Sequence, residues 1–307
     1  MSALSAPHFH DEEAAYAFVE ARIWPNGPNC PHCGGVDRIG KMGGKSTRVG
    51  TYKCYQCRKP FTVKIGTIFE ASHVPMRIWL QAMYLIAGSK KGISSNQLHR
   101  TLGVTLKTAW FMSHRIRESM RDGNPAMMGT TGGRVEVDET YIGNKDGVVK
   151  AKGKTGSAHK MRVVSLVDRD TGLARSMPAN SLVRDEVAQI VRANVAKEAK
   201  LTTDESRLYS AVGKEYASHD WTTHGRREYV RGDVTTNTVE GFFSIFKRGM
   251  RGIYQHCSEA HLHRYLAEFD FRYSNRVALG YNDADRSDAM LKGIVGKRLT
   301  YQTASRG

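Results

Sequence analysis

The strongest constraint on how this chain folds lies in its cysteines. Four of the five form two C-x2-C pairs, Cys30 with Cys33 and Cys54 with Cys57, with twenty residues between the pairs. Each pair suits a tight turn that offers two thiolates to one ion, and the span between them suits a short β-hairpin. Four thiolates close a tetrahedral shell, which is typical of structural zinc, and the metal replaces a core too small to form alone. Residues 25–72 are therefore predicted to be a zinc ribbon.

The cysteine pairs have alternative interpretations. A single C-x2-C pair also occurs in thiol redox sites, but two pairs at ribbon spacing favour zinc. His32 lies inside the first pair and is an alternative ligand, although four cysteines already complete the shell. Cys257 stands alone and is interpreted as a packed or surface thiol. The ribbon is expected to bind DNA or protein.

The charge balance points to a polyanionic partner. The 307 residues contain 46 Lys and Arg against 30 Asp and Glu, a formal net charge of +16. Such a surplus favours nucleic acid over an anionic membrane surface. No apolar run approaches the ~20 residues of a spanning helix, and the N-terminal segment, residues 1–24, lacks a secretion-signal pattern. We expect a cytosolic protein, or a nuclear one if the cell has a nucleus.

A second small module is predicted at 73–122. A helix over 76–90 is followed by a short helix with Ser94 or Ser95 as its N-cap, a break at Gly103, and a second helix capped by Thr105. This pattern is typical of a helix-turn-helix, and an ordinary helical hairpin is the alternative. The basic residues on or near the second helix are Lys107, His114, Arg115 and Arg117.

The remaining chain has an α/β pattern. Residues 123–133 are rich in Gly, Pro and Thr and mark a linker, and 281–307 is expected to be a C-terminal tail. Between them, 134–280 is predicted as a catalytic domain with a mixed sheet. Its expected strands are 134–143, two within 162–179, 201–206 and 215–224, and its expected helices are 181–200, 207–213, 235–250 and 258–276.

Acidic residues occur at three places in this α/β pattern. Asp138 lies on the first expected strand, Asp204 ends the fourth, and Glu240 lies on a later helix. If the first and fourth strands are neighbours, the three carboxylates converge at one edge of the sheet. Such oxygen ligands suit Mg²⁺. Two such ions can activate a water or 3′-hydroxyl and stabilise a departing oxygen, as phosphodiester transfer requires.

The helix over 235–250 carries both an acid and a base. Its apolar positions at helical spacing predict a core-facing stripe. Glu240 and Lys247 are seven residues apart, almost two turns, and share another face. A solvated polar face is the plain alternative. Asn237, one turn before Glu240, can point to the same site.

These spacings resemble a known family. Sixty-five residues separate Asp138 from Asp204, thirty-five separate Asp204 from Glu240, and Lys247 lies seven further on. This is similar to the D, D-35-E pattern of DDE transposases and integrases, which have an RNase H-like core. The stretches "VEVDETYIG", "TTDESRLYSAVG" and "TNTVEGFFSIFKRGMRGIY", with the ribbon, resemble more narrowly the IS1595 (ISXO2-like) group of bacterial insertion-sequence transposases.

The resemblance implies a DNA transposase that binds the ends of its element and catalyses metal-dependent strand cleavage and strand transfer. It implies two Mg²⁺ or Mn²⁺ ions on Asp138, Asp204 and Glu240, with Asn237 as the alternative third ligand. Lys247 is expected to be the basic residue of the catalytic set, seven positions after Glu240, and to hold a phosphate next to the scissile one. The resemblance also implies a bacterial, cytoplasmic protein associated with the nucleoid. The expected partner is double-stranded DNA, both inverted-repeat ends and target, and the expected assembly is a homo-oligomer.

Two other functions remain open: a DNA-binding regulator with an inactive RNase H-like domain, and a metal-dependent nuclease without strand transfer. The segment 144–162 is read either as a basic hairpin that follows a phosphate backbone or as a solvated loop. The residues expected to contact DNA are Lys107, Arg115, Lys150, Lys152, Lys154, Lys247, Arg248 and Arg251.

Overall fold

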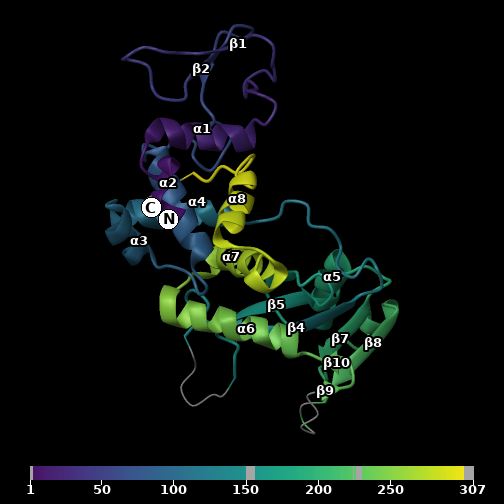
Figure 1. Cartoon of the computed structure of the whole chain (residues 1–307). Coiled ribbons are helices and arrows are strands. Elements are labelled where there is room, and N and C mark those ends of the chain that lie inside the picture. Colours follow the sequence, from purple (N-terminus) through teal and green to yellow (C-terminus); the bar gives the residue numbers. More distant parts are fainter. Residues whose placement is uncertain (1–2, 150–155, 224, 226–229, 301–307) are drawn as a thin grey trace. The chain divides into compact units, whose positions relative to one another are not determined.

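The computed structural model describes residues 3–149, 156–223, 225 and 230–300. The chain divides into two compact units (Figure 1). The first combines Met1–Arg121 with Tyr281–Gly307, and the second is Asp122–Gly280. No described helix has the length and apolar character needed to cross a membrane.

The zinc ribbon is the first part of unit 1. Three short antiparallel strands pair in the order β1-β2-β3. Around the buried Cys30 and Cys54, a small apolar cluster gathers aromatic side chains, including Trp24 and the buried Phe61. The strands are β1 (Ile39–Lys41), β2 (Tyr52–Cys54) and β3 (Pro60–Phe61).

Helices form the rest of unit 1. Asp11 caps α1 by accepting from the Ala14 N–H, and Glu12 caps α2 by accepting from the N–H of Met76 at 2.7 Å. These side chains satisfy helix N–H groups that have no partner within the helix. The elements are η1 (Ala3–Ser5), η2 (Pro7–Phe9), α1 (Glu12–Ile23), α2 (Met76–Gly88), α3 (Ser95–Leu102), α4 (Leu106–Ser119) and α8 (Asp283–Lys292).

The predicted caps of the helix-turn-helix segment are present. Ser94 accepts from the Gln97 N–H, Thr105 accepts from the Thr108 N–H, and Gly103 ends α3 with φ of 64°. A left-handed C-terminal residue is a common helix end that favours glycine. Lys107, in the first turn of α4, is exposed.

The C-terminal half of α4 departs from the sequence interpretation. Arg115 is only 5% exposed. Its guanidinium donates to the carbonyl oxygens of Ile68 and Glu70, both at 2.8 Å, and to that of Leu299 at 3.1 Å. His114 and Arg117 are buried as well. Arg115 therefore tethers segments of unit 1 in this structure, and its contact with DNA stays a prediction.

The segment expected to be a C-terminal tail contains a packed helix. α8 begins with a capping box between Asn282 and Asp285 and contacts α2. The buried Arg286 donates to the Ala87 carbonyl oxygen at 2.9 Å, and Met290 is fully buried. Residues 281–300 thus complete the core of unit 1.

Unit 2 is built on a five-stranded mixed sheet in the order β6-β5-β4-β7-β8. β6, β5 and β4 pair antiparallel, the predicted Asp168 to Gly172 turn joins β5 to β6, and β4, β7 and β8 are parallel. The strands are β4 (Arg134–Ile142), β5 (Met161–Asp168), β6 (Ala174–Ala179), β7 (Lys200–Asp204) and β8 (Ser218–Thr222). The predicted pairing of the first and fourth strands is confirmed.

Helices cover both faces of this sheet (Figure 1). Val135 and Val137 of β4 face α5 with Leu201 of β7, whereas Ile142 faces α6 and α7. This alternation is the period of two expected of a strand covered on both sides. The predicted stripe on α6 is buried there: Val239, Phe242, Phe243, Phe246 and Met250. The helices are α5 (Arg184–Asn194), α6 (Asn237–Gly249) and α7 (Leu262–Ser274).

Short elements complete unit 2. The helix expected over 207–213 is absent from this described stretch, which instead forms turns and a 3-10 helix, η3 (Val212–Glu215). A two-stranded hairpin leads into α6, and α6 continues as a π-helical turn. These elements are β9 (Val230–Arg231), β10 (Val234–Thr235), η5 (Met250–Tyr254), η6 (Glu259–His261) and η7 (Val277–Leu279).

Candidate active site and metal centre

The zinc site is built by the two C-x2-C turns. The Sγ atoms of Cys30 and Cys57 lie 3.6 Å apart, and those of Cys33 and Cys54 lie 3.7 Å apart. All four Sγ atoms lie within 4.8 Å of one another. Tetrahedral zinc with bonds of about 2.3 Å requires sulfur atoms about 3.8 Å apart. The geometry fits structural zinc.

His32 lies outside this set. Its Nε2 is 3.4 Å from the Pro60 carbonyl oxygen, so the ring faces the strand that closes the ribbon. Cys257 belongs to unit 2, where its thiol is buried and donates to the Ser258 carbonyl oxygen. The four-cysteine shell of the sequence interpretation is therefore the one that forms.

Parallel pairing of β4 with β7 brings the two catalytic aspartates of the prediction side by side. The last residue pair of this ladder is Glu136 with Thr202. Asp138 lies two residues after Glu136, and Asp204 lies two residues after Thr202. Asp138 Oδ1 accepts from the Glu139 N–H at 2.7 Å, and Asp204 Oδ1 accepts from the Ser206 N–H at 3.0 Å. Local backbone donors thus fix one oxygen of each carboxylate.

Glu240 reaches the same site from the first turn of α6. Its Oε1 accepts from the Thr236 hydroxyl at 2.9 Å. Burial, together with the negative charges of Glu139, Asp204 and Glu240, raises the pKa of Asp138 to about 8. Carboxylates that oppose each other's ionisation in this way lie in one electrostatic neighbourhood.

This carboxylate group fits a divalent cation by its chemistry. Its donors are hard oxygens, and a cation among them would relieve their mutual repulsion. Among the residues that the structure describes, the four cysteines are the one group of three or more ligand side chains whose ligand atoms gather within 4.8 Å.

Lys247 lies two turns along α6 and is half-buried. Burial lowers its pKa, the neighbouring Arg251 lowers it too, and the negative charge of Asp138 acts in the opposite direction. The lysine is therefore within electrostatic reach of the carboxylates. Arg248 and Arg251 are exposed along the same helix and its π-helical extension.

Asn237, the alternative third ligand, is the exposed first residue of α6. Its backbone N–H donates to the Thr235 hydroxyl at 3.1 Å. Glu240 as the third ligand, with Asn237 as the alternative, stays a prediction. Lys150, Lys152 and Lys154 lie outside the described residues, so their predicted DNA contacts stay a prediction.

Acidic neighbours that the sequence did not assign have structural partners. Glu139 accepts from the hydroxyl of the buried Tyr209 at 2.5 Å. Glu205 is exposed and accepts from the Gly225 N–H at 3.1 Å. Glu136 is fully buried on the α6 side of the sheet. Strand alternation is the sequence signal for Glu136, because it shares a strand face with Asp138.

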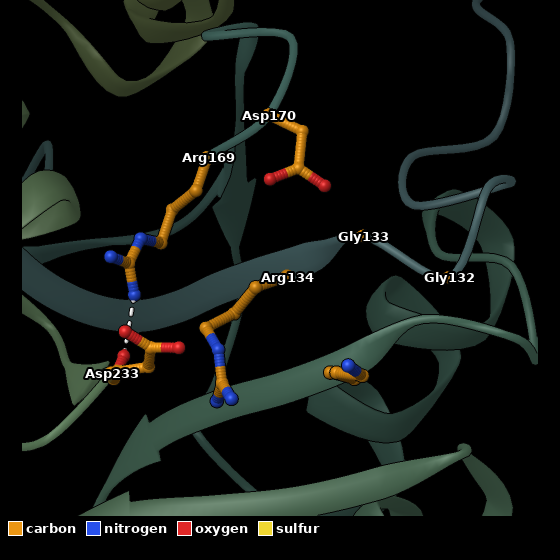
Figure 2. Close-up of a pocket in the computed structure, with 7 residues that line it drawn as sticks. Gly132, Gly133, Arg134, Arg169, Asp170 and Asp233 are labelled. Atoms are coloured by element: carbon orange, nitrogen blue, oxygen red, sulfur yellow. Dashed lines mark hydrogen bonds between the residues drawn. The ribbon is translucent and has the colours of Figure 1, made fainter.

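The pocket drawn in Figure 2 lies elsewhere in unit 2. Arg134 and Lys200 are the first residues of the parallel strands β4 and β7, so the pocket lies at the opposite end of these strands from Asp138 and Asp204. Its guanidinium groups are already paired: Arg134 with Asp220 at 3.2 Å, and Arg169 with the Asp233 carbonyl oxygen at 2.6 Å. This pocket is not the site of the converging carboxylates.

The fold and the site define a class of proteins in which a DDE-type catalytic domain follows a zinc ribbon in the sequence. The family model described as ISXO2-like transposase domain matches residues 130–274, and the model described as transposase zinc-ribbon domain matches residues 10–60. Both are IS1595 models, and they occur in the predicted order. The chain belongs to the IS1595 (ISXO2-like) family of insertion-sequence transposases.

A curated relative is similar over most of both chains. It is an uncharacterized protein in transposable element ISH50 of Halobacterium salinarum, 28% identical over an alignment of 284 residues that covers 85% of this chain and 90% of the relative.

Two solved structures are more distant. The catalytic core domain of BIV integrase is 15% identical, with 45% of this chain and 81% of that chain covered and a TM-score of 0.29. A chain of the simian T-cell lymphotropic virus intasome in complex with PP2A regulatory subunit B56 gamma is 14% identical, with 56% and 63% covered and the same TM-score of 0.29.

Proposed function

We propose that this transposase-family protein binds the inverted-repeat ends of its insertion sequence and catalyses metal-dependent cleavage and strand transfer there. The observation that carries the proposal is the convergence of Asp138, Asp204 and Glu240, produced by the parallel pairing of β4 with β7 and by α6. Family membership supplies the reaction class, phosphodiester hydrolysis and transesterification on DNA.

In this proposal the three carboxylates hold two Mg²⁺ or Mn²⁺ ions. When bound, these ions activate the attacking water or 3′-hydroxyl and stabilise the departing oxygen. The chain itself orients the carboxylates: the Glu139 and Ser206 N–H groups hold the two aspartates, and the Thr236 hydroxyl holds Glu240. Such preorganised geometry supplies most of what phosphoryl transfer needs from a protein.

The proposed DNA contacts come from both units. In unit 1 the zinc ribbon and the exposed first turn of α4, with Lys107, would read the element's ends, since the N-terminal residues of a recognition helix contact base edges. In unit 2, Lys247, Arg248 and Arg251 would hold phosphates near the scissile bond. Cutting two ends together favours a dimer or larger assembly on DNA. Association of the protein with the bacterial nucleoid stays a prediction made from the sequence.

The test is a cleavage assay on a labelled duplex that carries the element's terminal repeat, with Mg²⁺ or Mn²⁺ present or absent. Metal-dependent nicking at the repeat end, followed by joining to a second duplex, is expected. Binding without nicking would favour a DNA-binding regulator with an inactive domain. Nicking without joining would favour a metal-dependent nuclease.

We expect binding to any duplex to weaken steeply as salt rises. Each phosphate contact releases counterions and contributes about −0.9 to the slope of log affinity against log salt. Replacing Lys150, Lys152 and Lys154 together with alanine should flatten this slope and keep the preference for the element's ends. The measurement is equilibrium binding at several salt concentrations. An unchanged slope would favour the alternative interpretation of residues 144–162 as a solvated loop.

Lys247→Ala is expected to slow cleavage by about ten- to a hundredfold, because a charged phosphate contact of about 1.5–3 kcal/mol would be lost. Metal binding should persist, since Lys247 lies about 10 Å from Glu240 along the helix axis at 1.5 Å per residue. Single-turnover cleavage and Mn²⁺ titration would be compared in the variant. Arg248→Ala, on an exposed neighbouring position, serves as the comparison, with a smaller loss expected.

A further inference from the structure

The placement of Glu240 depends on how the first turn of α6 is held. In α6 the N-cap residue is Thr236, and its hydroxyl donates to Glu240 instead of accepting from the helix. The first-turn N–H groups of a helix need acceptors from elsewhere. In this helix the acceptor is a side chain a hundred residues away in sequence.

That acceptor is Glu136 of β4. Its Oε2 accepts from the Val239 N–H at 2.9 Å, and its Oε1 accepts from the Thr238 hydroxyl at 2.8 Å. Val239 is the third helical residue, the position that a capping side chain usually serves. Because Glu136 is completely buried, these are low-dielectric contacts in which a negative charge meets the positive end of the helix.

Arg169 extends the same contact. Its Nε lies 3.6 Å from Glu136 Oε1, and its Nη1 donates to the Asp233 carbonyl oxygen at 2.6 Å. Asp233 lies in the β9–β10 hairpin, immediately before α6, and Figure 2 shows Arg169 directed towards it. One arginine therefore joins the buried carboxylate to the segment that leads into the helix.

The geometry points to Glu136 as a positioning residue for the catalytic metal site. It lies two residues from Asp138 on the same strand face and bonds the residue that directly precedes Glu240. It thereby fixes the distance between two proposed metal ligands on different elements, β4 and α6. This inference rests on the proposed function, because it assumes that Asp138 and Glu240 hold the ions.

The experiment titrates Mn²⁺ into the full-length, zinc-loaded protein by calorimetry. Glu136→Gln should weaken Mn²⁺ binding about tenfold, in the range found when partners of metal ligands are removed. Cleavage should then need about tenfold more Mn²⁺ for half-maximal rate, with a near-normal rate at saturating metal. Hydrogen exchange at the first turn of α6 should become faster, while DNA binding stays unchanged.

Glu186→Gln is the matched control. Glu186 also accepts from backbone N–H groups, those of Asn180 and Ser181, and from the Ser181 hydroxyl, but it serves α5 on the other face of the sheet. We expect its Mn²⁺ affinity to equal that of the wild type. Equal loss of Mn²⁺ affinity in both variants would show general destabilisation and overturn the inference, as would wild-type affinity in Glu136→Gln.

Thr238→Val keeps the test decisive if Glu136→Gln does not fold. It removes only the hydroxyl that donates to Glu136, and a few-fold weaker Mn²⁺ binding is expected. Unchanged affinity in this variant would overturn the inference. If the wild type binds Mn²⁺ through these residues but cuts no DNA, the proposed function fails while the positioning role stands. If the wild type cuts and Glu136→Gln responds to metal normally, only the positioning role fails.

Discussion

Glu240→Gln is expected to abolish Mg²⁺- or Mn²⁺-dependent cleavage of a labelled end duplex and leave DNA binding nearly intact. The change keeps the shape of the side chain and removes the charge that a metal site requires. A metal contributes several kcal/mol to phosphoryl transfer, and each 1.4 kcal/mol is a factor of ten, so the loss should reach about a thousandfold or more. Asp138→Asn and Asp204→Asn should behave in the same way. Cleavage and binding are measured on the same duplex.

Glu205→Gln is a suitable control for this experiment. Glu205 follows Asp204 directly, but it is exposed and bonds the Gly225 N–H. Cleavage by this variant should match that of the wild type. Normal cutting by Glu240→Gln, together with loss of cutting in Asn237→Ala, would move the third ligand one turn back along α6. Normal cleavage by the single variants of Asp138, Asp204, Glu240 and Asn237 would refute the proposed catalytic function.

Loss of one ribbon cysteine is expected to unfold the ribbon. Cys30→Ser or Cys57→Ser breaks the four-sulfur shell, and ligation energy of about 10–16 kcal/mol is folding energy in modules of this kind. The small apolar cluster around Cys30 and Cys54 cannot compensate for that loss. We expect zinc release, measured as metal content per chain, and loss of specific binding to the element's ends. Unit 2 should stay folded, as its own core suggests.

Cys257→Ser provides the control for the zinc experiment. This thiol is buried in unit 2, outside the four-sulfur group. The variant should keep one zinc ion per chain and specific end binding. Retention of one zinc ion per chain by both Cys30→Ser and Cys57→Ser would refute the assignment of the four cysteines as the zinc ligands.

Local signals predicted much of this structure. The caps at Ser94, Gly103 and Thr105 are written in short stretches of sequence, and the four cysteines define their own geometry. Strand pairing was predictable for a different reason. If the two acids act together, the strands that carry Asp138 and Asp204 must be neighbours. The observed β4–β7 pairing makes them so.

Long-range partners limited what the sequence could predict. Arg115 reads as a surface cation, since its carbonyl partners lie on segments far away in the chain. The segment 207–213 reads as helical by its apolar spacing, but Tyr209 turns inward to Glu139 on β4. For α8 the Asn282–Asp285 capping box is a local helix signal, although the sequence prediction for this segment is a C-terminal tail. Side-chain contacts between distant elements override local patterns.

The contribution of residues 281–300 to unit 1 has a consequence for how the protein is made. Synthesis runs from the N-terminus, and domains generally fold as they emerge. Unit 2 is continuous, so it can fold while the last residues are still being added. Unit 1 cannot close until residues 281–300 arrive, because α8 covers α2 and Leu299, beyond α8, offers its carbonyl oxygen to Arg115. A chain cut short before residue 281 would carry all of unit 2 and an incomplete unit 1.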